Sequence, residues 1–147
     1  MTPFILSRLL IIEDDPNTLA GLQELLREEG FFVYGVTNGC KALEATNHKR
    51  FNIVLCDYCL PGMDGLEVCR ELKRLQPQLT LFLVTAHHHT DLENAAKQYG
   101  IQKIIDKPII FSDLLEALLS AAAEPRRRSD YRTDVAASMS AAAPIFA

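Results

Sequence analysis

Residues 52–65 read NIVLCDYCLPGMDG, so that a run of apolar residues ends on an acid and leads into a loop rich in turn-forming residues. The run 53–56 is continuous, which is typical of a parallel strand covered on both faces. Asp57 closes the run. Three interpretations are open for this acid: a capping residue, part of a metal site built on Cys56-x-x-Cys59, or a carboxylate placed at a sheet edge for chemistry.

Working outward from this stretch, short apolar runs alternate with amphipathic segments five times. The runs lie at 9–12, 31–36, 53–56, 79–84 and 104–105, and the helix-like segments at 16–29, 38–49, 64–75, 89–99 and from about 111 onward. Asn38 and Asp64 stand where N-caps are expected. Five βα repeats predict a three-layer α/β fold, in which a doubly wound parallel sheet has right-handed crossovers.

Length and composition are those of one ordinary globular domain. The chain has 147 residues, of which 48% are hydrophobic and 23% charged. We expect residues 1–123 to form the domain and 124–147, which are rich in alanine, serine and arginine, to be a flexible tail or linker stub.

The charge and the lengths of the apolar runs argue against nucleic acid and membranes as partners. A net charge of −4 does not favour direct binding of nucleic acid. The apolar runs are too short for a membrane span, and the start lacks a secretory pattern. We therefore expect a cytoplasmic protein without membrane contact.

Polar residues follow four of the five predicted strands. Glu13 and Asp14 come after the first, Asp57 after the third, Thr85 after the fourth and Lys107 after the fifth. Ligands of open parallel sheets bind at the carboxyl ends of the strands. Converging carboxylates need a cation, and Mg²⁺ prefers oxygen ligands. With a lysine and a hydroxyl added, the set suits phosphoryl transfer, with Asp57 as nucleophile.

The motifs LLIIEDDP, IVLCDYCLPGMDG, LVTA and DKP, in this order, resemble those of the receiver domain of two-component response regulators, of the CheY-like type. The resemblance covers roughly residues 8–122. It implies a flavodoxin-like fold with strand order 2-1-3-4-5, an order that periodicity alone does not give.

The resemblance also implies roles for the residues at the strand ends. Asp57 corresponds to the phosphoacceptor, and it would bind Mg²⁺ together with Asp14 as a direct ligand. Glu13 would hold the metal through water, and Cys59 would contribute its backbone carbonyl. The protein would then be a phosphoprotein and a magnesium-binding protein.

Thr85 and Lys107 complete the site that the resemblance implies. Thr85 corresponds to the switch hydroxyl, while Lys107 would pair first with Asp57 and then with a phosphoryl oxygen. The bond from Lys107 to Pro108 is expected to be cis, which proline permits. The donor would be a sensor histidine kinase or a histidine phosphotransfer protein. Output would run through the fourth helix, fifth strand and fifth helix to an unknown downstream protein, so the domain is not a dedicated enzyme.

Two positions depart from the family pattern. Ile104 stands where the family usually has an aromatic switch residue, so coupled threonine–aromatic motion cannot take its usual form. The second position is Cys59, where the family more commonly has a polar residue or methionine. By the resemblance, Cys59 and His87 would flank the path of a hydrolytic water, which leaves the lifetime of a phosphoryl group open. Ile104 is also the feature that favours an alternative function, a receiver-like binding module that works without phosphorylation. A further alternative is a receiver fragment of a larger regulator with an effector domain.

A redox or zinc role for Cys56-x-x-Cys59 is the less favoured interpretation, because Cys56 is expected in the core and zinc needs about four N or S ligands. Cys40 and Cys69 are expected on buried helix faces. Asp15 is interpreted as a solvated neighbour that caps the first helix, and the histidines at 87–89 as an exposed loop.

Overall fold

The protein is described by a computed structural model covering residues 7–123. One sheet has five parallel strands: β1 (Arg8–Ile12), β2 (Phe32–Val36), β3 (Ile53–Asp57), β6 (Thr80–Thr85) and β7 (Ile101–Asp106). Their order is β2-β1-β3-β6-β7, which is 2-1-3-4-5 for the five main strands and confirms the expected topology. Two short strands, β4 (Cys59–Leu60) and β5 (Met63–Asp64), form an antiparallel hairpin after β3.

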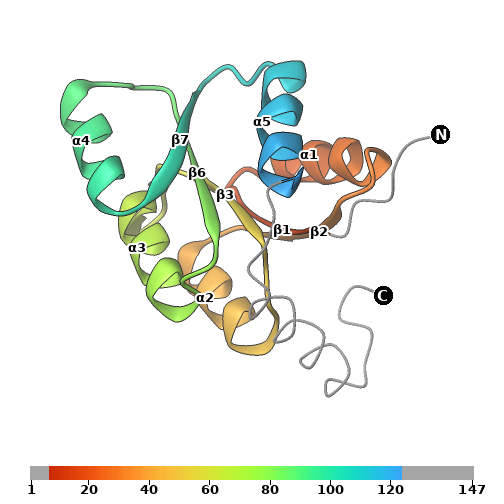
Figure 1. The fold of residues 1–147 in the computed structure, drawn as a ribbon, viewed down its shortest axis with the longest axis horizontal. Coiled ribbons are helices and arrows are strands. Elements are labelled where there is room, and N and C mark those ends of the chain that lie inside the picture. The colour runs from red at the N-terminus through yellow and green to blue at the C-terminus, as the bar shows by residue number, and fades with distance from the viewer. Residues whose placement is uncertain (1–6, 124–147) are drawn as a thin grey trace.

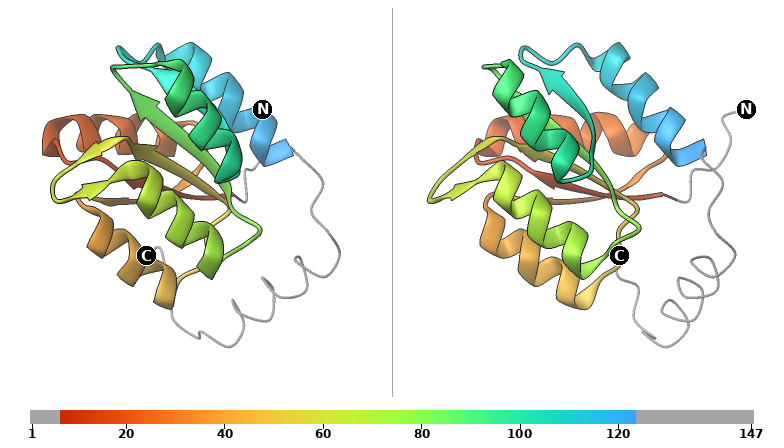
Figure 2. Two further views of the ribbon diagram at one scale, coloured as in Figure 1. Left: turned by 90° about the vertical axis from the view of Figure 1, so that its left-hand side faces the viewer. Right: turned by 60° about the vertical axis from the view of Figure 1, so that its left-hand side comes forward.

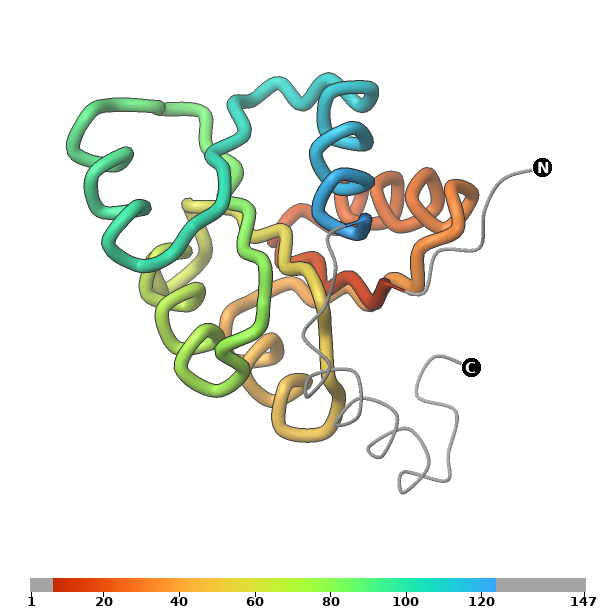
Figure 3. The backbone as a smooth tube through the Cα atoms, viewed as in Figure 1, coloured from red at the N-terminus to blue at the C-terminus, as the bar shows by residue number. Residues whose placement is uncertain are grey.

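Five helices cover the two faces of this sheet and complete the three layers. They are α1 (Pro16–Glu28), α2 (Gly39–His48), α3 (Gly65–Leu75), α4 (Thr90–Gln98) and α5 (Phe111–Ala123). α1 and α5 lie on one face and α2, α3 and α4 on the other (Figures 1 and 2). The chain runs from β6 through α4 to β7 and then crosses to α5 (Figure 3). The predicted tail at 124–147 lies outside the described residues.

Successive residues of β1 enter different cores, which explains the continuous apolar runs. Leu9 and Ile11 belong to the core beneath α1 and α5, whereas Leu10 and Ile12 belong to the core beneath α2, α3 and α4. Side chains alternate across a strand, so a strand covered on both faces must be apolar at every position. All five residues of β3 are buried.

Three of the helices begin at the predicted caps. The side chains of Asp15, Asn38 and Asp64 each accept a hydrogen bond from a first-turn backbone amide of α1, α2 and α3. α4 begins after His89, whose ring Nδ1 accepts a hydrogen bond from the amide of Leu92 at 3.1 Å. The capping interpretation of Asp15 is therefore confirmed.

Three details differ from the expectation. β7 begins at residue 101 rather than 104, because the exposed Gln102 and Lys103 interrupt its apolar pattern. The β4–β5 hairpin was not predicted. Cys40 is exposed and not in the core, because the buried face of α2 is formed by Gly39, Ala42 and Ala45, and Ala42 lies about 200° around the helix from Cys40. Cys69 is buried as expected.

Among the residues that the structure describes, no helix is long and apolar enough to cross a membrane.

Candidate functional site

The strand register brings the predicted site residues to one edge of the sheet. Ile12 pairs with Cys56 and Asp57 pairs with Val84 in neighbouring parallel strands, and Thr85 pairs with Asp106. Residues that follow these pairs therefore emerge side by side at the carboxyl edge. The position of the site follows from the parallel topology.

Three carboxylates converge there. Oxygen atoms of Glu13, Asp14 and Asp57 lie within 4.8 Å of one another, and among the described residues this is the group whose geometry could hold a metal ion. Glu13 and Asp57 are 7% and 5% exposed, whereas Asp14 is exposed. The set is made of hard oxygen donors with one side open to solvent, which fits a divalent cation such as Mg²⁺.

The electrostatics of Glu13 reflect this crowding. Burial, a hydrogen bond with Asp57 and the negative charge of Asp57 raise the pKa of Glu13 from 4.5 to about 7, although the charge of Lys107 acts in the opposite direction. Like charges that share a site cannot all ionise at low cost. A divalent cation would relieve that cost, so the cluster fits an oxygen-ligated metal on the chemistry of its donors.

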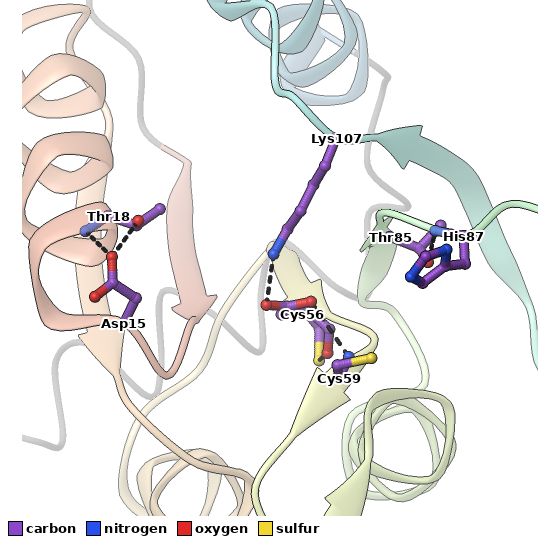
Figure 4. Close-up of polar contacts among 8 residues, drawn as sticks. Asp15, Thr18, Cys56, Cys59, Thr85, His87 and Lys107 are labelled. Carbon is purple, nitrogen blue, oxygen red and sulfur yellow. Dashed lines mark hydrogen bonds and ion pairs between the residues drawn. The ribbon is translucent and has the colours of Figure 1, made fainter.

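Asp57 is held from two sides. Lys107 Nζ donates to Asp57 Oδ2 at 2.9 Å, and the backbone amide of Cys59 donates to Asp57 Oδ1 at 3.2 Å. Burial acts to lower the pKa of Lys107, but the hydrogen bond and charge of Asp57 outweigh it, so the net shift is upward. Figure 4 shows the Lys107 side chain extending toward the loop that carries Cys59. The carboxylate is thus oriented before any ligand binds.

Thr85 occupies the end of β6 and is 3% exposed. Its hydroxyl accepts a hydrogen bond from the His87 amide at 3.0 Å, and its carbonyl accepts one from the Lys107 amide at 2.8 Å. The bond between Lys107 and Pro108 is cis, as predicted. These contacts tie the loop after β6 to the residue that pairs with Asp57.

Gly65 is required by the packing beneath Asp57. A Cβ atom at this position would lie 2.2 Å from the carbonyl oxygen of Asp57 and 2.7 Å from the Cα of Tyr58. The Gly65 amide also donates to the Tyr58 carbonyl at 2.8 Å. The two glycines of the quoted stretch therefore serve different purposes. Gly62 has a positive φ of 71° and open space around it, whereas Gly65 allows a close backbone approach.

The cysteines do not assemble into a zinc or redox site in the described residues. Cys56 is fully buried, and its thiol pKa is raised by a hydrogen bond with Cys69 and by burial. Cys59 is exposed, and both are free thiols. A thiol with a raised pKa is a poor nucleophile and a poor metal ligand, so this interpretation has no support.

Neighbouring polar residues have other partners. Asp15 is bonded to the amide and hydroxyl of Thr18, which lowers its pKa, and Figure 4 shows it apart from Lys107. The three histidines at 87–89 are exposed, as expected. Sequence analysis missed that the ring of His88 contacts both Glu93 and Asp106, since no spacing rule connects residues from a loop, a helix and a strand end.

The domain has a five-stranded, doubly wound sheet whose carboxyl edge carries an acidic cluster, a buried aspartate and a lysine. These features match the class of protein that the sequence motifs implied. The comparison with known families agrees, because the response regulator receiver domain family matches residues 9–119. The chain belongs to this family, and with it to the proteins of two-component systems.

Individual relatives give the same result. The chain is 35% identical over 118 residues to the transcriptional regulatory protein ZraR of Klebsiella oxytoca, a match that covers 80% of this chain and 27% of that protein. It is 27% identical to sporulation initiation phosphotransferase F of Bacillus subtilis, over 76% of this chain and 90% of that protein. The chain therefore spans only about a quarter of the length of some of its curated relatives.

Solved structures confirm the flavodoxin-like fold. A CheY-like receiver domain protein from Methanospirillum hungatei superposes with a TM-score of 0.76 at 28% identity, covering 80% of this chain and 94% of that one. The response regulator TrrA from Thermotoga maritima, solved in complex with Mg(2+)-BeF, superposes with a TM-score of 0.71 at 28% identity, covering 79% and 99%.

Proposed function

We propose that this domain accepts a phosphoryl group on Asp57 from a phosphohistidine of a sensor histidine kinase or a histidine phosphotransfer protein. One observation carries the proposal. A buried carboxylate is oriented by Lys107 at 2.9 Å and lies within 4.8 Å of two further carboxylates, at the edge of a receiver-family sheet.

The transfer is a displacement at phosphorus. An oxygen of Asp57 attacks, the P–N bond of the phosphohistidine breaks, and the imidazole leaves with the electron pair and takes up a proton from solvent. The product is an acyl phosphate on Asp57. Such reactions need positioning and neutralisation of charge more than covalent help from the protein.

Glu13, Asp14 and Asp57 would hold Mg²⁺, with the backbone carbonyl of Cys59 as the further ligand that the family pattern implies. When bound, the ion neutralises the charge of the carboxylates and of the incoming phosphoryl oxygens. The TrrA neighbour, solved with Mg(2+)-BeF, supports this choice of metal. The oxygen-only donor set is the support from this chain.

Lys107 and Thr85 would respond to the new charge. Lys107 can exchange its contact with Asp57 for one with a phosphoryl oxygen. The Thr85 hydroxyl accepts from the His87 amide and can still donate, since a hydroxyl does both. The proposed output surface consists of α4, β7 and α5, and an unknown downstream protein would bind there by population shift.

The domain therefore acts as a phosphoacceptor and not as a dedicated enzyme. Cys59 and His87 would influence the lifetime of the phosphorylated form. The cytoplasmic location stays a prediction.

Intact-protein mass spectrometry with a small phosphodonor, with and without Mg²⁺, tests the proposal. We expect wild type and Asp15→Asn to gain one phosphoryl group only with Mg²⁺, and Asp57→Asn to gain none. Asp15→Asn is the matched control, because it removes a neighbouring carboxylate that is bonded to Thr18. If wild type gains nothing, the phosphorylation-independent binding module replaces this proposal.

A further inference from the structure

His88 lies in the loop between β6 and α4, on the side of the molecule where output is proposed. Its ring Nε2 is 2.7 Å from Glu93 Oε1, in the first turn of α4, and its ring Nδ1 is 2.9 Å from Asp106 Oδ1, at the end of β7. One side chain of the loop after β6 therefore contacts both the first turn of α4 and the end of β7.

The chemistry of these two contacts fixes the charge of the ring. An ionised carboxylate only accepts hydrogen bonds, and a neutral imidazole has one N–H donor. Both contacts can be hydrogen bonds only if His88 is an imidazolium. The neutral ring would turn a lone pair toward one of the two carboxylates and lose that contact.

The position of Asp106 connects this contact to the site. Asp106 pairs with Thr85 in the β6–β7 register and directly precedes Lys107, which bonds to Asp57. Glu93 belongs to the helix next to β7. A bond through His88 therefore joins the strand end beside the site to the first turn of α4.

We propose that His88 is a pH-sensitive clasp, which in its protonated form holds the first turn of α4 to the end of β7 and thereby opposes rearrangement of the α4–β7 surface. Loss of the ring proton releases one of the two carboxylates and loosens α4. The link to phosphoryl uptake rests on the proposed function, but the pH-dependent anchoring of α4 does not.

The charged groups that face His88 support this direction of the pH dependence, in which the protonated ring holds α4. Asp106 from β7 raises the pKa of His88 by hydrogen bond and charge, burial opposes it, and Glu93 from α4 adds to the increase. Lys107 is turned to Asp57. A pKa above the usual value means that the clasp is intact below about 6.5 and is lost as the pH rises through the raised value.

His89 acts in the opposite direction and must be separated in any test. Its ring Nδ1 accepts the amide hydrogen of Leu92, so protonation of that nitrogen would remove the cap of α4. The ratio of amide protection between wild type and His88→Gln removes this effect, because both proteins contain His89 and the acidic cluster.

Hydrogen exchange of the α4 amides, without phosphodonor, is the deciding measurement. We expect wild type to be protected about two- to fivefold more than His88→Gln at pH 6, as for an exposed ion-pair network. At pH 8.5 the ratio should be close to one. His87→Gln is the control, since it removes a neighbouring exposed histidine, and it should behave as wild type at both pH values. A ratio of one at pH 6, or the same ratio at both pH values, overturns the proposal.

A second test replaces each of the two carboxylates in turn and measures the pKa of the His88 ring. In a titration of the His88 ring followed by NMR, Asp106→Asn should lower the pKa more than Glu93→Gln does, because Asp106 is the larger influence. An unchanged ring pKa in both variants would equally overturn the clasp.

Adding Mg²⁺ and a small phosphodonor then tests the link to the site. The change in α4 exchange on phosphoryl uptake should be smaller at pH 6 than at pH 8.5 in wild type, and independent of pH in His88→Gln. If no mass increment is found, the proposed function fails while the exchange of the unmodified protein still decides the clasp. If uptake occurs with the same α4 response in both proteins, the clasp has no part in output.

Discussion

β3 and β7 end at the same edge of one sheet, but they are built differently. Every residue of β3 is buried, and its last residue, Asp57, is held by Lys107 and by the Cys59 amide. No residue of β7 is fully buried, and its last residue, Asp106, is exposed and bonded to His88.

The difference fits the two tasks proposed for these strand ends, a reacting carboxylate at Asp57 and a switching surface at α4, β7 and α5. A reacting carboxylate must keep its position, so it follows a strand that is packed on both faces. A surface that changes between two arrangements needs contacts of low individual cost, and half-buried side chains with exposed ion pairs provide them. Ile104 fits this description, since it is half-buried and packs against the core beneath α2, α3 and α4.

Truncating one apolar residue in each strand is the strongest test of this comparison. Leu55→Ala in β3, where the side chain is 2% exposed, should lower the free energy of unfolding by about 2–5 kcal/mol because it leaves a cavity. Ile104→Ala in β7 should cost only about 1–2 kcal/mol, since solvent fills part of the space. Urea unfolding followed by circular dichroism measures both. Equal losses would mean that β7 is as firmly packed as β3.

The same contrast explains what could be predicted from the sequence. β3 was predicted because a doubly buried strand must be apolar throughout, and the acids and lysine after the strands were predicted because strand ends converge. The prediction for β7 was too short, because the solvent-exposed Gln102 and Lys103 interrupt its run of apolar residues. The strand order came from the family resemblance, because periodicity carries no information on which strands are neighbours.

Contacts that depend on three-dimensional placement were beyond the sequence. The bond from the Cys59 amide to Asp57 depends on the backbone path of the β4–β5 hairpin. The contacts of His88 join positions 5 and 18 residues away in the chain. Such contacts arise only in the folded chain, so no local sequence pattern predicts them.

The acidic cluster should lower the stability of the metal-free domain as pH rises. Glu13 has a pKa of about 7 in the folded chain and an ordinary value of 4.5, so the folded state keeps a proton that the unfolded state has lost. The corresponding stability is fully present below pH 4.5 and is lost as the pH rises through 7. We expect a decrease of about 1–3 kcal/mol between pH 4.5 and 8.

Chemical denaturation with a metal chelator, for wild type and Glu13→Gln at each pH, isolates this contribution. The variant keeps a neutral side chain of similar size, so the difference between the two proteins should follow the titration of Glu13. Mg²⁺ should restore the stability of wild type at pH 8 and have little effect at pH 5. A difference that does not change with pH would mean that the cluster is relaxed without metal.

The smallest expected effect is the difference between substitutions of two adjacent acids. This difference decides whether the carboxyl edge of the sheet selects a metal ion by geometry or only by charge. Asp14 belongs to the cluster within 4.8 Å, whereas the carboxylate of Asp15 is bonded to Thr18. Asp14→Asn should weaken Mg²⁺ binding about tenfold, or about 1.4 kcal/mol. Asp15→Asn should change it by less than about twofold, because a screened neighbouring charge adds little. Titration calorimetry gives the Mg²⁺ dissociation constants of both variants. Each variant removes one negative charge, so equal weakening of Mg²⁺ binding would show that the ion responds only to the net charge of the edge. Unequal weakening in the expected order would show that the rigid ends of β1 and β3 select the ion by the placement of their oxygen atoms.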